Sequence, residues 1–289
     1  MSFQKILAFV KKHSITILRV LSQLTFFFLA PGLFTSAFGG AKSIAASMGG
    51  GEVLELSAHI TTLILLTAFT LLFGRVFCGY ACSFGALGDA VYTMAGWLKK
   101  KMGLKAKPLN PPQWLKYLKY VVLAVILVIC FTGNQQTLHD ISPWNVFAQF
   151  VGVSIPSAAY WVGYIVLALI IIGMAMVPRF FCRFLCPMGA IFSILPPALL
   201  LRIKKPSAAS DSFKACGKCK LCSSKCPAGL ALNQEDVITS GECFSCHRCV
   251  EACYQRKPQL SFFGWTGLTR LKILLMIALL TALVLLLGL

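Results

Sequence analysis

Thirteen cysteines are the residues of this sequence most able to carry chemistry, because thiolates bind metal ions and iron–sulfur clusters. Eight of them form two runs of one spacing, Cys-x2-Cys-x2-Cys-x3-Cys, which begin at Cys216 and Cys243. Structural zinc sites pair cysteines as Cys-x2-Cys, which leaves the third cysteine of each run unexplained. Disulfides are disfavoured in the cytoplasm, where the charge pattern described below places this segment. The two runs therefore favour iron–sulfur clusters over zinc or disulfides.

The same spacing is typical of bacterial ferredoxins with two [4Fe–4S] clusters, in which three close thiolates bind one cluster and the fourth reaches the other. The predicted ligands are Cys216, Cys219, Cys222 and Cys253 for cluster 1, and Cys243, Cys246, Cys249 and Cys226 for cluster 2. Tyr254 stands where the second run would have a proline, a residue that binds no iron. Basic residues between the ligands offset the charge of the clusters, or alternatively dock an acidic redox partner.

Four further cysteines belong to an internal repeat, in which residues 74–86 align with residues 178–190. The copies share Arg, Phe, Gly, Ala and a Cys-x3-Cys motif, and the paired positions are Cys78 and Cys82 in the first copy and Cys182 and Cys186 in the second. Cysteines four apart share a helix face, so we expect both pairs to converge on a third metal centre, iron–sulfur in type. Regulatory disulfides or thiols without metal are the alternatives.

Other residues of the repeat sharpen this expectation. Arg75, Arg179 and Arg183 are expected to add positive charge near the third centre. Ser83 stands where the second copy has Pro187, and this difference could alter the turn that aims Cys82. The remaining cysteine, Cys130, lies outside the repeat and is predicted only to pack.

The composition predicts a membrane protein. Residues of the AVILMFWYC set make up 57% of the 289 residues and charged residues only 12%, too few to cover a soluble fold of this length. Five stretches approach the roughly 20 apolar residues that a spanning helix needs. The predicted spans are Ser14–Ala30, Ser57–Phe77, Trp114–Phe131, Tyr160–Val177 and Leu268–Leu287.

The basic residues indicate how these spans are oriented. The formal net charge is +18, and Lys and Arg gather in or beside the loops on one side of the predicted spans. By the positive-inside rule that side is the cytoplasm, so the N-terminus and the ferredoxin segment are predicted inside. The loops Pro31–Leu56 and Thr132–Ala159 and the C-terminus are predicted outside. Topology explains the basic charge more simply than nucleic acid, which is not expected as a partner.

The predicted fold is an α-helical membrane protein of five transmembrane helices with a cytoplasmic bacterial-type two-[4Fe–4S] ferredoxin insert. We expect a four-helix membrane domain with the two Cys-x3-Cys repeats at residues 1–203, a ferredoxin domain at 204–265 and a C-terminal spanning helix at 266–289. The stretches Ala86–Leu98 and Ala190–Leu201, which follow the two copies of the repeat, are expected to lie along the membrane interface.

The outer loop after the third span offers a second kind of chemistry. It contains His139 and Asp140, and His59 near the outer end of the second span could approach it. A His–Asp pair near lipid could accept protons from a quinol. The sequence favours the alternative that the pair is solvated and caps a turn. An outer site lies roughly 30 Å from the cytoplasmic boundary, so another redox group would be needed between it and the ferredoxin clusters.

The spans, the two boundary Cys-x3-Cys motifs and the ferredoxin runs together resemble the NapH/NosR-type membrane iron–sulfur proteins, over about residues 5–260. The resemblance implies a quinol dehydrogenase component of the bacterial cytoplasmic membrane that passes electrons between the quinone pool and other redox subunits. Ser83 and the fifth span depart from the pattern, and the large N-terminal flavin-binding domain of NosR has no counterpart here.

We therefore expect a membrane-integral electron-transfer subunit. Its expected cofactors are two [4Fe–4S] clusters, a third iron–sulfur centre and quinone, with membrane lipid and other redox subunits as partners. A metallocentre-assembly or metal-reducing protein, and a redox-sensing scaffold, are the alternatives. The sequence contains no G-x-G-x-x-G or P-loop motif, so NAD(P)H is not expected as the direct donor.

Overall fold

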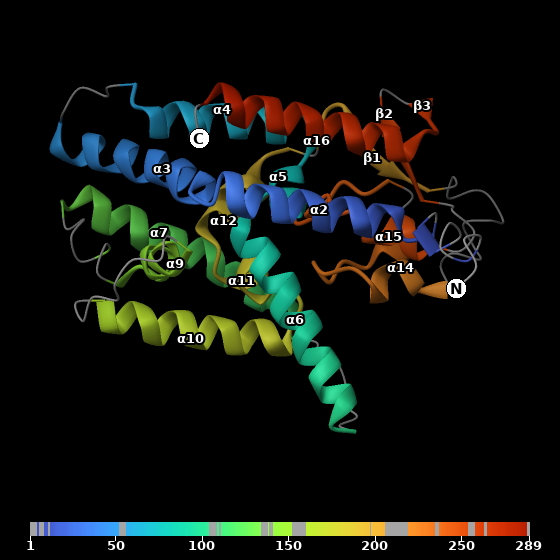
Figure 1. Ribbon diagram of the computed structural model, residues 1–289. Coiled ribbons are helices and arrows are strands. Elements are labelled where there is room, and N and C mark those ends of the chain that lie inside the picture. The colour runs from blue at the N-terminus through green and yellow to red at the C-terminus, as the bar shows by residue number, and fades with distance from the viewer. Residues whose placement is uncertain are drawn as a thin grey trace. The chain divides into compact units, whose positions relative to one another are not determined.

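The computed structural model describes residues 5, 9–10, 12–51, 56–103, 109, 111–133, 138, 141–151, 160–196, 198–205, 219–234, 237–253, 258–262 and 265–287 (Figure 1). Most of these residues are helical. The longer helices are α2 (Ser14–Leu29), α3 (Leu33–Gly50), α4 (Ala58–Phe73), α6 (Ser83–Lys101), α7 (Leu118–Phe131), α9 (Pro143–Val151), α10 (Trp161–Met176), α12 (Pro187–Ile194) and α16 (Thr269–Leu286). The short ones are α5 (Val76–Tyr80), η1 (Gln113–Tyr117), α11 (Phe180–Phe184), α14 (Leu221–Ser224), η3 (Leu232–Gln234) and α15 (Arg248–Ala252). The strands are β1 (Leu201–Lys204), β2 (Gln259–Phe262) and β3 (Trp265–Thr266).

The chain folds as two compact units. The first consists of Met1–Phe26, Thr67–Ala81 and Phe192–Gly288, and it therefore combines the ferredoxin segment with α5, α16 and most of α2. The second consists of Phe27–Leu66 and Cys82–Ile191. The first copy of the repeat thus divides after Ala81, and the second copy lies within the second unit.

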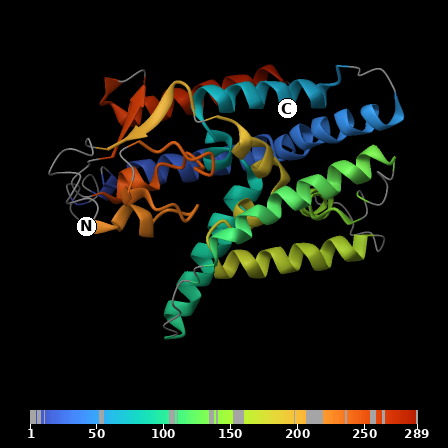
Figure 2. The same cartoon turned by 180° about the vertical axis from the view of Figure 1, so that it is seen from behind.

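The first unit contains a small antiparallel sheet, whose strands precede and follow the two cysteine runs in the sequence. Its strand order is β1-β2-β3, with Leu201 opposite Phe262 and Phe262 opposite Trp265. Figure 2 shows the sheet from behind, with the chain running on from β3 into α16. The short helices α14 and α15, which carry cysteines of the two runs, pack against each other.

The ferredoxin segment also holds the start of the first long helix. The Glu251 carboxylate, from α15, accepts hydrogen bonds from the backbone N–H groups of Ile15 and Thr16 and from the Thr16 hydroxyl. The first N–H groups of a helix have no partner within the helix, and its positive dipole end favours an anion. Glu251 therefore caps α2 across more than 230 residues of sequence.

The second unit is a bundle of helices. Helix α3 packs on α7, and α10 packs on α6, α9 and α11. Helix α10 buries one stripe of residues at helical spacing, Gly163, Leu167, Ile170 and Met174, and leaves its other apolar side chains exposed or half-buried.

The helices support the prediction of a membrane protein. A helix stands at each of the five predicted spans. Among the described residues, Gln113–Phe131 and Thr269–Leu286 are long and apolar enough to cross a membrane, and α2 and α3 together would form a third span bent by 65°. Helices α4 and α10 are apolar but have 16 residues each, which rise about 24 Å against a bilayer core of about 30 Å.

Helix α16 shows why these helices require lipid. It buries Ile273, Met276, Leu280 and Val284 along one stripe, while leucines on its other sides are exposed. A helix that is apolar all round and buried on only one face needs an apolar medium on the others.

The structure corrects two expectations about loops. Most of the loop predicted over Pro31–Leu56 is helical, because α3 occupies Leu33–Gly50. Its small residues gave a weak hydropathy signal, and they allow close packing: a side chain at Gly49 would collide with the carbonyl of Phe131. The stretch Ala190–Leu201 is not one interfacial segment, since α12 ends at Ile194 and β1 begins at Leu201.

Candidate iron–sulfur sites

The cysteines predicted to bind cluster 2 surround one cavity in the first unit. Cys226, Cys243, Cys246 and Cys249 all line it, and most of its other lining residues are apolar. Cys226 comes from the first run and the other three from the second, so the fold brings together the two parts of the predicted ligand set. Four thiols in an apolar enclosure are the donors that a [4Fe–4S] cluster takes.

Burial raises the pKa of three of these thiols, those of Cys226, Cys243 and Cys249. Desolvation raises the pKa of Cys243 to about 12 and, together with the neighbouring cysteines, raises the pKa of Cys249 well above its usual value. Burial likewise raises the pKa of Cys226, although backbone N–H groups at residues 228–230 hydrogen-bond its sulfur and act in the opposite direction. Thiolates gathered in this way need positive charge, and the residues fit the iron of a cluster.

The cluster 1 ligands are described in part. Cys216 lies outside the described residues; Cys219 is exposed, and Cys222 and Cys253 are half-buried. The described parts of the two runs nevertheless share one local feature. Lys220 and His247, which are equivalent positions, both have left-handed backbone (φ 50° and 55°) and each precedes a short helix.

Across the described part of the chain, no group of three or more His, Cys, Asp or Glu side chains is arranged to hold one metal ion. A cluster distributes its thiolates over four irons, which places the ligands farther apart than they stand around one ion. No disulfide joins any of the twelve described cysteines.

The Cys-x3-Cys motifs have a shared local structure that differs from the expected single helix. The first cysteine lies within a five-residue helix, Cys78 in α5 and Cys182 in α11. The second stands immediately before the next helix, Cys82 before α6 and Cys186 before α12. The expectation that each pair shares a helix face is therefore wrong, because Cys82 has extended backbone (φ −68°, ψ 121°).

This break explains why Ser83 can replace a proline. Ser83 and Pro187 are both the first residue of the following helix, a position that tolerates proline because its N–H has no partner within the helix. The extended backbone of Cys82 is also what a following proline would require. The Ser83 hydroxyl instead donates a 3.4 Å hydrogen bond to the carbonyl of Pro31.

All four motif cysteines are buried, and they are divided between the units. Cys78 belongs to the first unit, and Cys82, Cys182 and Cys186 to the second. Within the second unit, α6 packs on α11, and the rings of Phe84 and Phe181 lie 5.0 Å apart. The third centre remains a prediction.

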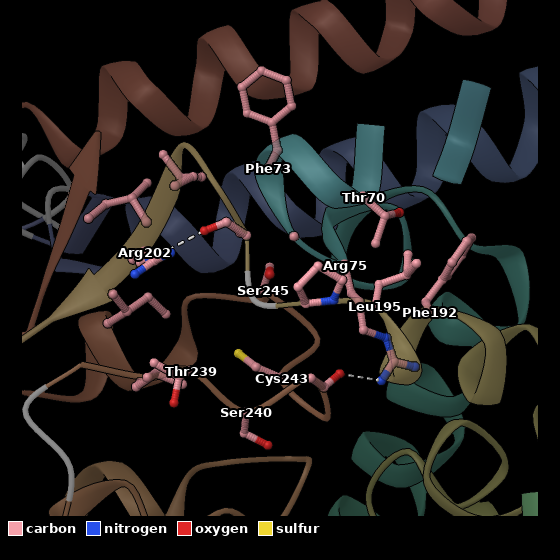
Figure 3. A pocket seen from close by; sticks show the side chains of 18 of the residues that line it. Thr70, Phe73, Arg75, Phe192, Leu195, Arg202, Thr239, Ser240, Cys243 and Ser245 are labelled. Atoms are coloured by element: carbon pink, nitrogen blue, oxygen red, sulfur yellow. Dashed lines mark hydrogen bonds between the residues drawn. The ribbon is translucent and has the colours of Figure 1, made fainter. Parts of the chain in front are cut away.

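The arginines of the repeat have different partners. Arg75 lies beside the loop of the predicted cluster 2 ligands, where it donates a 3.0 Å hydrogen bond to the carbonyl of Gly241 (Figure 3). Its guanidinium also stands 5.2 Å from the ring of Phe244. It lines one cavity with Cys243 and partly offsets the rise in the pKa of that thiol.

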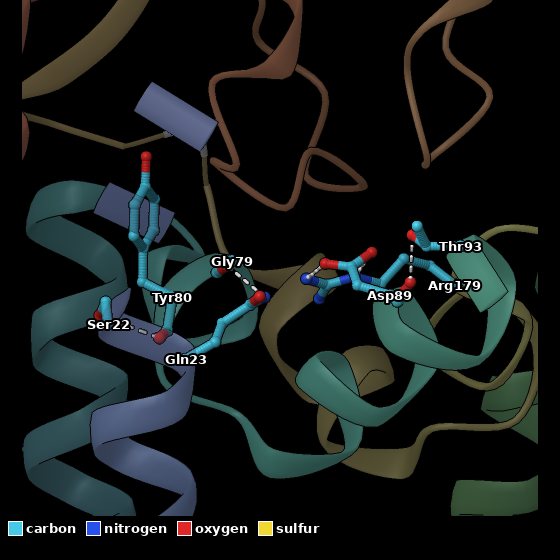
Figure 4. A network of polar contacts seen from close by, with 7 residues as sticks. All are labelled: Ser22, Gln23, Gly79, Tyr80, Asp89, Thr93 and Arg179. Carbon is cyan, nitrogen blue, oxygen red and sulfur yellow. Dashed lines mark hydrogen bonds and ion pairs between the residues drawn. The ribbon is translucent and has the colours of Figure 1, made fainter. Parts of the chain in front are cut away.

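Arg179 is buried and forms a bidentate ion pair with Asp89, with distances of 2.6 and 3.1 Å (Figure 4). Arg183 stands 4.9 Å from the ring of Phe184. Arg75 also stands 3.8 Å from a carboxylate oxygen of Glu242. Both arginines are therefore ion-paired, Arg75 beside the loop that carries the predicted cluster 2 ligands and Arg179 within the second unit.

Sequence reasoning missed several polar residues of the first unit. Ser22 and Gln23 lie in a predicted span, yet both are buried and donate to the carbonyls of Tyr80 and Gly79 (Figure 4). The Tyr80 hydroxyl lies 2.8 Å from Nδ1 of His247. The adjacent polar residues Ser22 and Gln23 in an apolar helix could have predicted these contacts, because polar residues of a membrane helix face protein and not lipid.

A second cavity, in the second unit, concerns the outer loop. It is lined by His59 and by residues of that loop, Ser142, Trp144 and Asn145, together with Lys42. His59 therefore approaches the loop as expected, and its Nδ1 lies 3.0 Å from the Ser36 hydroxyl. His139 and Asp140 lie outside the described residues. An adjoining aromatic cavity shares Trp144 and is lined by Phe27, Phe34, Phe84 and Phe147.

Comparison with known proteins agrees with this picture. The family model described as "4Fe-4S binding domain" matches residues 58–105 and 160–206, which contain the two Cys-x3-Cys motifs. The uncharacterized protein MJ0749 of Methanocaldococcus jannaschii is 31% identical over 261 residues, which cover 89% of this chain and 91% of that protein.

Two further relatives carry descriptive names. The ferredoxin-type protein NapH of Escherichia coli is 28% identical over 69% of this chain and 67% of its own length. The regulatory protein NosR of Pseudomonas aeruginosa is 28% identical over 68% of this chain and 26% of its own length. No solved structure matches the chain.

Apolar helices joined to a ferredoxin-type segment with a cysteine-lined cavity define a membrane iron–sulfur protein. The family model matches the chain twice, and MJ0749 is 31% identical to the chain over 91% of its own length. The chain therefore belongs to the NapH/NosR-type 4Fe–4S ferredoxin family.

Proposed function

We propose that this protein is an electron-transfer subunit of a membrane complex, with two [4Fe–4S] clusters in its ferredoxin segment. The observation that carries the proposal is the single cavity lined by Cys226, Cys243, Cys246 and Cys249. A bound cluster supplies one-electron chemistry. The chain positions the ligands, excludes water from them and tunes their charge through Arg75 and the backbone N–H groups near Cys226.

The proposed cluster 1 is held by Cys216, Cys219, Cys222 and Cys253. The exposure of Cys219 and the lysines around it suit this end of the segment to exchange electrons with an acidic partner protein. Cluster 2 is more enclosed, since Cys246 and Cys249 are buried, and it lies beside the first Cys-x3-Cys motif.

The four motif cysteines are proposed to hold a third iron–sulfur centre. Support comes from their burial, from their shared position around a helix break, and from the family matches over both motifs. Cys186 accepts a 3.2 Å hydrogen bond from the N–H of Gly189, which stabilises negative charge on its sulfur.

Quinone is the proposed membrane-soluble partner. The polar cavity at His59 offers Lys42, Ser142 and Asn145 as groups that could hold a quinone head, and the adjoining aromatic cavity offers an apolar wall for its tail. In this proposal the protein is a five-span protein of the bacterial cytoplasmic membrane, with its ferredoxin segment inside and its C-terminus outside.

The first experiment is to purify the whole protein anaerobically in detergent and measure iron, sulfide and the EPR spectrum. The ferredoxin segment alone predicts about eight irons. Cys246→Ser should remove or convert one cluster, whereas Cys130→Ser, at a buried cysteine outside every predicted set, should change nothing. Full iron and an unchanged spectrum in Cys246→Ser would refute the cluster assignment.

The quinone site is tested by mixing the purified protein with a reduced quinone analogue and following cluster reduction. His59→Asn should slow the reduction at least tenfold while iron content stays constant. His13→Asn serves as the control because His13 does not line this cavity. Equal rates in both variants would remove the quinone proposal and leave the cluster assignment intact.

Rapid transfer of metal to an apo-partner protein, without electron transfer from any quinol, would instead favour a metallocentre-assembly role. Clusters that are reduced but pass electrons to no partner would favour a redox-sensing scaffold.

A further inference from the structure

A buried tyrosine of the first Cys-x3-Cys motif contacts the loop that carries the cluster 2 ligands. The Tyr80 hydroxyl lies 2.8 Å from Nδ1 of His247, and the exposed fractions of the two side chains are 0% and 1%. Both residues belong to the first unit. His247 stands between Cys246 and Cys249 in the sequence and lines the same cavity.

The backbone around Tyr80 is fixed from two sides. Helix α2 donates hydrogen bonds from Ser22 and Gln23 to the carbonyls of Tyr80 and Gly79, as Figure 4 shows. On the other side, Gly79 packs directly on the cluster 2 loop: a Cβ there would stand 2.7 Å from the carbonyl oxygen of Phe244. Tyr80 is thus held in one position relative to the loop.

His247 is held in an uncommon conformation. Its φ is 55°, and Ser245, on the other side of Cys246, has φ 47°. Left-handed backbone at residues other than glycine is sterically unfavourable and persists where the surroundings fix it. The contact from Tyr80 is one of the interactions that fix the His247 ring.

The hydrogen bond from Tyr80 fixes the orientation of the buried imidazole beside the predicted cluster ligands. Hydrogen bonds and dipoles near the sulfurs are known determinants of cluster potentials.

We propose that Tyr80 is a positioning residue that acts through His247 to set the reduction potential of cluster 2. This rests on the proposed function, because it takes Cys243, Cys246, Cys249 and Cys226 as ligands of a cluster. The second copy of the repeat has Phe184 at the equivalent position, so the hydroxyl is particular to the copy that contacts the ferredoxin loop.

The test is an EPR-monitored redox titration of the whole purified protein. Tyr80→Phe keeps the ring and removes only the hydroxyl. We expect at least a tenfold change in the reduced-to-oxidised ratio of cluster 2 at fixed potential, which is 59 mV for a one-electron couple. Cluster 1 should not shift. Tyr117→Phe, which removes the hydroxyl of an exposed tyrosine, should leave both potentials unchanged.

A second variant separates a role through His247 from a direct one. His247→Asn keeps a residue that tolerates left-handed backbone. In that background Tyr80→Phe should add no further shift. An equal shift with and without His247, or no shift in Tyr80→Phe with iron content intact, would overturn the inference.

Two other results are equally decisive. Loss of cluster 2 iron in Tyr80→Phe would overturn the inference by giving the hydroxyl a structural role. A parent protein without cluster iron would instead reject the proposed function itself.

Discussion

The two copies of the repeat share their cysteines and differ in what their polar residues contact. In the first copy, Arg75 and Tyr80 contact the cluster 2 loop, at Gly241 and at His247. In the second copy, Arg179 forms a buried ion pair with Asp89, and Phe184 lies against Phe180.

The difference shows that a repeat can keep the spacing of its cysteines while the residues around them make different contacts. Each copy retains a five-residue helix, a break and a second helix around its cysteines. The positions between the cysteines vary: Gly79 and Tyr80 in the first copy correspond to Arg183 and Phe184 in the second. Gly79 lets the first copy pack against the backbone of Phe244, and the Tyr80 hydroxyl contacts the His247 ring. The second copy has neither the small residue nor the hydroxyl at these positions.

The largest expected effect concerns the buried ion pair of the second copy. Arg179→Met should destabilise the protein by about 3–5 kcal/mol, because it leaves the Asp89 carboxylate without its charged partner. The measurement is thermal unfolding in detergent. The double variant Arg179→Met, Asp89→Leu should recover most of the loss. An equal loss in the double variant would show that the pair is not the cause.

The matched substitution in the first copy should act on the cluster instead. Arg75→Met is expected to perturb the EPR signal and the potential of cluster 2, because Arg75 contacts the loop at Phe244 and partly offsets the charge at Cys243. A spectroscopic change in Arg179→Met as large as that in Arg75→Met would end the distinction between the copies.

A medium effect is expected at the close backbone contact of the first copy. Gly79→Ala should cost about 1–3 kcal/mol, because its Cβ would displace the Phe244 carbonyl and the loop that holds Cys246. Iron content and unfolding temperature should both fall. At the equivalent position of the second copy, Arg183→Ala should leave iron unchanged. Full iron in Gly79→Ala would show that the loop moves without cost.

The smallest effect on stability is expected from giving the first copy the proline that the second copy has at Pro187. Ser83→Pro should change the free energy of unfolding by less than about 1 kcal/mol, because Cys82 already has the extended backbone that precedes proline. It removes one weak hydrogen bond, to Pro31. Denaturation of the parent and variant in the same detergent measures the difference, and a large loss would mean that the serine hydroxyl is needed.

Much of this architecture is predictable from the sequence because it rests on local patterns. The apolar runs predict α7 and α16, and the spacing of the cysteines predicts which of them gather around the cluster 2 cavity. Helix α3 escaped prediction because its glycine and alanine residues are weakly apolar, and they serve packing against α7.

By itself, the sequence predicted the kinds of ligands and their spacing, since a Cys-x2-Cys-x2-Cys-x3-Cys run leaves few chemical alternatives. It also indicated a membrane protein, because hydropathy is a sum over neighbouring residues. Only the tertiary structure decided that Tyr80 contacts His247, 167 residues away, and that Arg75 contacts Gly241 and Phe244. Such pairs depend on how distant segments pack, and no local pattern encodes which buried polar groups will satisfy each other.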